Sequence, residues 1–130
     1  MGFDVFSSRA RQGWRVALWL QIALVTGLML WPRPPAGLDL TGWDKLNHAI
    51  AFAGPALAGL LARRRPGVRS ATLLLAGLLA WGGLLELLQS RLPPRQGDWA
   101  DLLADAVGLA VGALAYVGLR RLSAVRRSSD

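Results

Sequence analysis

The 130-residue sequence contains no cysteine. Disulfide bonds and thiolate chemistry are therefore excluded, and the redox compartment of the protein cannot be read from cysteine usage. The chain also lacks the Gly-x-Ser-x-Gly sequence that holds a nucleophilic serine in many hydrolases. A standard covalent nucleophile is thus not evident.

Acidic residues and histidine are scarce. The chain has eight Asp and Glu and a single His against 15 Lys and Arg, which gives a formal net charge of +7. Such an excess of positive charge can indicate nucleic-acid binding. Here, however, the arginines occur in short clusters between long apolar segments, which is the pattern of membrane topology. We therefore predict a lipid bilayer as the partner and no nucleic acid.

Long apolar segments account for the hydrophobic content of 53%. Four of them have roughly the ~20 residues that a helix needs to cross the hydrocarbon layer. Prolines at 32, 34 and 35 and at 93 and 94 predict loops. The sequence predicts one all-α domain over residues 1–130, an integral membrane four-helix bundle with spans at about 14–31, 44–62, 70–89 and 99–119. No small-residue cleavage site follows the first segment, so we interpret it as a retained span. We expect residues 123–130 to form a frayed tail.

The basic residues predict an orientation. Three precede the first span, four separate the second from the third, and four follow the last, so eleven of the 15 Lys and Arg lie on one side. By the positive-inside rule both termini are cytoplasmic, and the first and third loops face outward. We therefore expect a multi-pass protein of the cytoplasmic (inner) membrane. The three clusters are Arg9, Arg11 and Arg15; Arg63, Arg64, Arg65 and Arg69; and Arg120, Arg121, Arg126 and Arg127.

Five of the eight acids and the single histidine fall at the predicted outward end of the last three spans. Charged groups near hydrocarbon are costly unless they are paired or functional. Pairs of these residues share helix faces, because they are three or four positions apart. The sequence predicts an outward-open polar pocket, with acid–base candidates His48, Glu86 and Asp105 and binding candidates Asp44, Lys45, Gln89, Arg95, Asp98 and Asp101.

Glycines lie on the same helix stripes as the acids. Gly108-x-x-x-Gly112 follows Asp105, and Gly82-Gly83 lies one turn before Glu86. Small residues let membrane helices pack closely. We therefore expect these stripes to face the bundle interior, with the loop 91–97 as a roof over the pocket.

Structural explanations compete with the functional one. Thr41-x-x-Asp44 matches a capping-box pattern, and Asp98 is a candidate N-cap. Capping explains Glu86 and Asp105 poorly, because Glu86 is near a helix C-terminus and Asp105 is two turns inside a helix. For these two the alternative is a buried ion pair with Arg95 or Lys45. His48 could simply form a hydrogen bond within the bundle.

The same residues carry a family likeness. The patterns Asp44-Lys45-x-x-His48-x-x-x-Phe52, Glu86-x-x-Gln89 and Arg95-x-x-Asp98-x-x-Asp101-x-x-x-Asp105-x-x-Gly108 occur in order over residues 41–115. This region resembles the VanZ-like family, which is named for a protein linked to low-level teicoplanin resistance. The sequence departs from the family in having Asp105 where Asn is frequent. The resemblance implies a small polytopic bacterial membrane protein tied to the cell envelope, but it supplies no reaction.

Three functions follow from this pattern. The first is a protein that recognises an envelope lipid or its head group. The second is a membrane hydrolase or transferase acting on a lipid-linked substrate, with carboxylates and imidazole dividing the acid and base roles. The third is an ion- or proton-coupled transporter, because membrane acids and histidines form relays. The carboxylates could also hold a hard divalent cation, but a lone histidine with acids is a weak metal signal. We therefore predict no metal ligands and leave any cofactor unknown.

Overall fold

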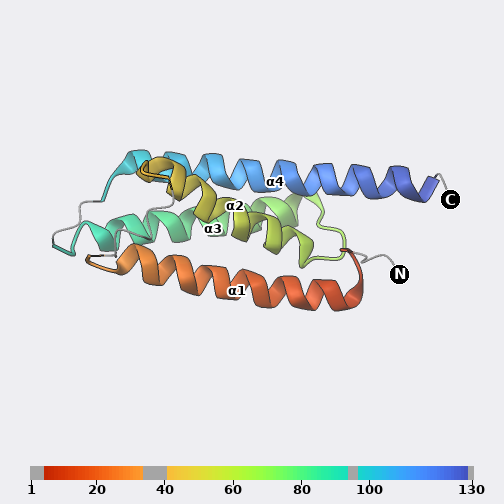
Figure 1. The fold of residues 1–130 in the computed structure, drawn as a ribbon, viewed down its shortest axis with the longest axis horizontal. Helices are drawn as coiled ribbons and strands as arrows, with labels where there is room; N and C mark the ends of the chain where they lie inside the picture. Colours follow the sequence, from red (N-terminus) through yellow and green to blue (C-terminus); the bar gives the residue numbers. More distant parts are fainter. Residues whose placement is uncertain (1–4, 34–40, 94–96, 129–130) are drawn as a thin grey trace.

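The computed structural model describes residues 5–33, 41–93 and 97–128. These residues form four helices and no strand: α1 (Ser8–Leu30), α2 (Asp44–Leu61), α3 (Val68–Gln89) and α4 (Trp99–Ser128). Successive helices run in opposite directions, so the start of α1 and the end of α4 lie at the same end of the bundle (Figure 1). The all-helical prediction is confirmed over the described residues.

Two helix boundaries differ from the predicted spans. α1 begins at Ser8 rather than near residue 14, because the Ser7 side chain caps it by accepting a hydrogen bond from the Ala10 amide. α4 continues to Ser128, so the frayed tail predicted from residue 123 is wrong for 123–128. Residues 119–128 contain no glycine or proline, and arginines near a helix C-terminus interact favourably with its dipole.

Three of the described helices are long and apolar enough to cross a membrane, namely α1, α3 and α4. α2 is not among them, although the sequence predicts a span there. Its 18 residues begin with Asp44, Lys45, Asn47 and His48, which lower its mean hydropathy. Length and composition therefore support a multi-pass membrane protein with three candidate spans.

α2 occupies the centre of the bundle. It packs against all three other helices, and its contact with α4 is the most extensive in the structure. Its C-terminal half is almost completely enclosed, with Ala56, Ala58, Leu60 and Leu61 each at most 2% exposed. Protein side chains therefore enclose much of the one described helix that is not a candidate span.

Two glycines set the spacing between α2 and α4. A Cβ atom added at Gly108 would collide with the carbonyl oxygen of Ala49, and one added at Gly112 would collide with that of Ala53. The two backbones are therefore in direct contact, as the small-residue pattern predicts. This close approach brings side chains one turn before Gly108 into reach of the first turns of α2.

The interior and exterior of the bundle are both apolar. The core is centred on Phe52, whose ring lies 5.0 Å from that of Trp81 between centroids. The outer faces carry large apolar side chains that are 64–70% exposed, such as Leu20, Leu73 and Leu114. Water-soluble monomers rarely expose contiguous apolar surface on this scale, whereas helices in lipid do so.

The close approach of α2 and α4 can be tested with two glycines of one helix. We expect Gly108→Ala to lower the free energy of unfolding by about 1–3 kcal/mol, because the added methyl group overpacks the contact with Ala49. Gly118→Ala is the matched control, since a Cβ there meets nothing within 4 Å. Thermal unfolding of both variants in detergent measures the difference. Equal stability of the two variants would contradict the direct backbone contact.

Candidate functional site

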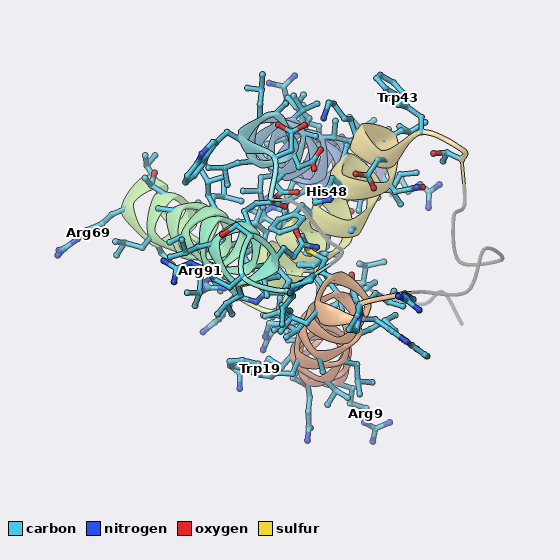
Figure 2. All side chains as sticks on the ribbon, turned by 90° about the vertical axis from the view of Figure 1, so that its left-hand side faces the viewer. Arg9, Trp19, Trp43, His48, Arg69 and Arg91 are labelled. Atoms are coloured by element: carbon cyan, nitrogen blue, oxygen red, sulfur yellow. The ribbon has the colours of Figure 1, made fainter. Side chains whose placement is uncertain are left out.

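Charged and polar side chains from three helices converge at one end of the bundle. This is the end where α2 and α4 begin and α3 ends (Figure 1). His48 lies between these helices in the end-on view (Figure 2). The most deeply buried polar side chains of the described residues are all here, each at most 6% exposed: His48, Glu86, Gln89, Asp101 and Asp105.

The centre of the site is a hydrogen bond between α2 and α4. His48 Nδ1 lies 2.9 Å from Asp105 Oδ1, and Asp105 is completely buried. Gly82 of α3 makes room for this carboxylate, because a Cβ there would lie 2.6 Å from Asp105 Oδ2 and 2.9 Å from the Phe52 ring. Asp105 Oδ2 has no hydrogen-bond partner among the described residues. Gly82, which lies one turn before Glu86 in sequence, is therefore part of the site through its contact with Asp105.

Glu86 connects the end of α3 to the start of α4. Its Oε2 accepts a hydrogen bond from the Asp98 amide at 2.9 Å. Its Oε1 lies 3.9 Å from His48 Nδ1 and has no hydrogen-bond partner within the described part of the chain. One oxygen thus holds the backbone, and the other faces the imidazole.

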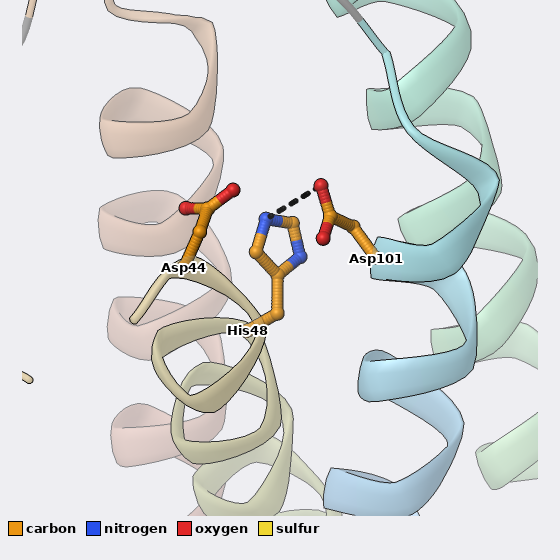
Figure 3. A group of neighbouring side chains, drawn as sticks. All are labelled: Asp44, His48 and Asp101. Atoms are coloured by element: carbon orange, nitrogen blue, oxygen red, sulfur yellow. Dashed lines mark ion pairs between the residues drawn. The ribbon is translucent and has the colours of Figure 1, made fainter. Parts of the chain in front are cut away.

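Lys45 and two aspartates form the outer part of the site. Lys45 Nζ donates to Asp98 Oδ2 at 2.8 Å and to Asp101 Oδ1 at 2.9 Å. The other oxygen of Asp101 lies 3.9 Å from His48 Nε2. Figure 3 shows the imidazole between the carboxylates of Asp44 and Asp101. One ligand atom from each of these three residues lies within 4.8 Å of the others, so they form a group that could hold a metal ion.

The structure confirms one of the two predicted helix caps and contradicts the other. Asp98 Oδ1 accepts a hydrogen bond from the Ala100 amide at 2.8 Å, so Asp98 caps α4 as predicted. The capping box at the start of α2 is wrong. The N-cap of α2 is Trp43, which makes no side-chain capping bond, and the Thr41 hydroxyl instead bonds to the Trp43 backbone.

The alternative of a buried ion pair with Lys45 is also wrong for Glu86 and Asp105, because the ammonium group binds Asp98 and Asp101. Arg95, the other predicted countercharge, lies outside the described residues. Gln89 is buried, and its side-chain amide donates to the Met29 carbonyl at 2.7 Å. Gln89 therefore links α3 to the end of α1 and makes no hydrogen bond to the acids.

Two contributors to the site were not predicted. The Asp98 amide holds Glu86, and the Met29 carbonyl holds Gln89. Both are backbone groups: every residue type has the carbonyl, and every type except proline has the amide N–H. No residue pattern could have indicated them, because their role depends only on where the chain passes.

Asp98, which directly precedes α4, has its pKa changed by the groups that contact it. The Lys45 ammonium, and after it the Ala100 amide, hold the pKa of the Asp98 carboxyl below its usual range by stabilising the ionised form. Asp98 is therefore an anion at neutral pH, and its charge is neutralised by Lys45. The site as a whole is rich in hydrogen-bond acceptors, and its one lysine, Lys45, is already bound to Asp98 and Asp101.

Comparison with protein-family models, curated proteins and solved structures found no match to this chain. The resemblance to the VanZ-like family therefore stays a prediction. Function is inferred below from the geometry and charge of the site.

The contact between His48 and Asp105 should dominate the stability of this end of the bundle. We expect Asp105→Ala to lower the free energy of unfolding by about 3 kcal/mol or more, because removing one partner of a buried pair leaves the other unsatisfied. The same substitution at exposed Asp44 should cost far less. Thermal unfolding in detergent compares them, and a similar loss for both would rule out a special role for the buried pair.

Replacing Lys45 should change the pKa of the Asp98 carboxyl. We expect Lys45→Met to raise the pKa of Asp98 toward its ordinary value of about 4, because the ammonium no longer stabilises the carboxylate. Since the folded-state pKa is lowered, the ion pair stabilises the fold at neutral pH, and this contribution is lost as the pH falls through the lowered pKa. Carboxyl carbon NMR measures the shift. Arg91→Met is the control, because Arg91 forms no ion pair with a described acid, and an equal shift there would contradict the assignment.

Proposed function

We propose that this protein recognises a cell-envelope lipid through its head group, as a four-span protein of the cytoplasmic membrane with both termini in the cytoplasm. The observation that carries the proposal is the position and composition of the polar site. A group of carboxylates around one imidazole lies at the end of otherwise apolar helices. Such a place in a membrane bundle corresponds to the depth of lipid head groups.

The distribution of charge supports this orientation. The basic clusters belong to the start of α1, the connection between α2 and α3, and the end of α4, which lie at the end opposite the acids (Figure 1). A positive cytoplasmic end then places the acidic site at the outer surface. Trp31, Trp43 and Trp99 are 48–71% exposed at the acidic end, and tryptophan favours the membrane interface.

The chemistry of the site favours a ligand that donates hydrogen bonds. Ionised carboxylates only accept hydrogen bonds. Hydroxyl groups of a sugar and ammonium groups of an amino sugar, a peptide or ethanolamine are suitable donors. A head-group phosphate is a poorer direct partner for the side chains, because Lys45 is already bound to Asp98 and Asp101. We therefore infer that amine or hydroxyl groups of the head group are recognised first.

A second candidate is hydrolysis or group transfer on a lipid-linked envelope substrate. The observation that favours it is the orientation of His48. Asp105 holds Nδ1, while Nε2 faces the outer carboxylates. In this arrangement Nε2 could take a proton from a water or hydroxyl group as its oxygen attacks the substrate, and could return that proton to the leaving alcohol.

Binding of a defined lipid tests the first function. We expect purified protein in nanodiscs to bind acyl-chain-labelled phosphatidylethanolamine more tightly than the matching phosphatidylglycerol, because only the former carries an ammonium group. Asp44→Asn and Asp101→Asn should each weaken this binding by about tenfold, which corresponds to about 1.4 kcal/mol. Fluorescence polarisation gives the dissociation constants.

Arg63→Gln is a control for this binding, because it changes charge at the opposite end of the bundle. Unchanged affinity in both aspartate variants would reject the pocket. Release of a head-group product from a labelled lipid-linked amino sugar, abolished in His48→Gln, would instead support the enzymatic function.

A further inference from the structure

The two ring nitrogens of His48 have different surroundings. Nδ1 forms a 2.9 Å hydrogen bond with Asp105. Nε2 forms none with the described residues, and the nearby Asp101 Oδ2 is 3.9 Å away, too far for one. His48 is nevertheless only 6% exposed. His48 thus directs toward two carboxylates, those of Asp44 and Asp101, a ring nitrogen that has no hydrogen bond to the described residues (Figure 3).

The bond to Asp105 determines which nitrogen can act as a ligand. With Asp105 ionised, its carboxylate cannot donate, and the hydrogen of this bond then belongs to Nδ1. In the neutral imidazole the free lone pair is then on Nε2. Histidines that bind metals adopt this arrangement, with the other ring nitrogen donating to a carboxylate that fixes the tautomer.

The three candidate ligand atoms are close to the spacing that a metal requires. Those of Asp44, His48 and Asp101 all lie within 4.8 Å of one another. Tetrahedral ligands at 2.0–2.2 Å from a zinc ion are about 3.3–3.6 Å apart, so the group has to contract to hold one. Asp44 is exposed, so its side chain is free to rotate toward the other two.

The charge of the site also favours a bound cation. Lys45 is the cation paired with these acids in the described part of the chain, and it binds Asp98 and Asp101. Glu86 Oε1 and Asp105 Oδ2 are buried without hydrogen-bond partners. Buried carboxylates are costly unless a positive charge offsets them. The buried part of the site therefore has more carboxylate oxygens than cations or hydrogen-bond donors to pair with them.

We propose that Asp44, His48 and Asp101 bind one Zn²⁺ ion, with Asp105 as the residue that positions His48. The imidazole favours zinc over magnesium and calcium, which prefer sites made only of oxygen ligands. Three protein ligands leave a fourth position for water or a ligand oxygen.

This inference goes beyond the proposed function, because zinc binding can occur whether or not a lipid is recognised. If the proposed function is also right, zinc and a head-group ammonium compete for Asp44 and Asp101, and the fourth zinc position takes a head-group phosphate oxygen instead. That additional step rests on the proposed function.

The chain has a single histidine, so every histidine ring signal in an NMR spectrum belongs to His48. Untagged full-length protein in detergent is freed of metal with a chelator and titrated with Zn²⁺ by calorimetry, and the ring nitrogens of ¹⁵N-labelled histidine are observed by NMR. We expect one equivalent of Zn²⁺ to bind and to shift Nε2 much more than Nδ1. Absence of saturable binding at millimolar Zn²⁺ would overturn the proposal.

Variants separate this site from adventitious binding. His48→Gln should abolish binding, and Asp44→Asn should weaken it by about tenfold or more without affecting the fold, because Asp44 is exposed. Asp105→Asn should weaken it by about 10–100-fold, as for other residues that orient a ligand. Its ¹⁵N spectrum should also show that Nε2 no longer holds the free lone pair. Asp130→Asn, the same change far away in sequence, should have no effect.

Wild-type affinity in both His48→Gln and Asp44→Asn would overturn the site. If His48→Gln fails to fold, Asp44→Asn decides alone. Phosphatidylethanolamine binding with and without chelator distinguishes the two proposals. Lipid binding without zinc binding rejects only the metal site, and zinc binding without lipid binding rejects only head-group recognition.

Discussion

The hydrogen bond between His48 and Asp105 is the contact on which the rest of the polar site depends. It crosses the interface of α2 and α4 in the interior of the bundle. It can form only because the two helix backbones touch at Gly108 and because Gly82 leaves space for the carboxylate. A polar pair this deeply buried is stable only when its members satisfy each other. Close helix packing and polar chemistry are therefore linked in this protein.

The other acids are arranged around this pair according to their exposure. Buried Glu86 uses one oxygen to hold the start of α4 and turns the other toward the imidazole. Exposed Asp98 caps α4 and binds Lys45, so its charge is neutralised. Asp101 lies between the two environments, with one oxygen on Lys45 and the other facing His48 Nε2. The carboxyl oxygens that have no cation or hydrogen-bond donor are therefore concentrated around the imidazole.

Much of this arrangement could be predicted, because helical periodicity is a local property. Spacings of three and four residues placed the acids and glycines on shared faces, and the glycine contacts agree with that prediction. The capping box predicted at Thr41 is wrong, because the Thr41 hydroxyl forms hydrogen bonds with the backbone of Trp43 instead. The span predicted for α2 has less support than the others, because α2 is not apolar enough to count as a candidate span. It packs against all three other helices instead of facing outward along its length.

Composition and helical periodicity act over a few turns, so they were enough to predict apolar helices and the gathering of most of the acids at one end. Which acid meets which cation was decided only by the tertiary structure. Lys45 binds Asp98 and Asp101, more than 50 residues away, and Gln89 turns to α1. These partners depend on how helices distant in sequence pack against each other, and no local pattern encodes the rotation of one helix relative to another.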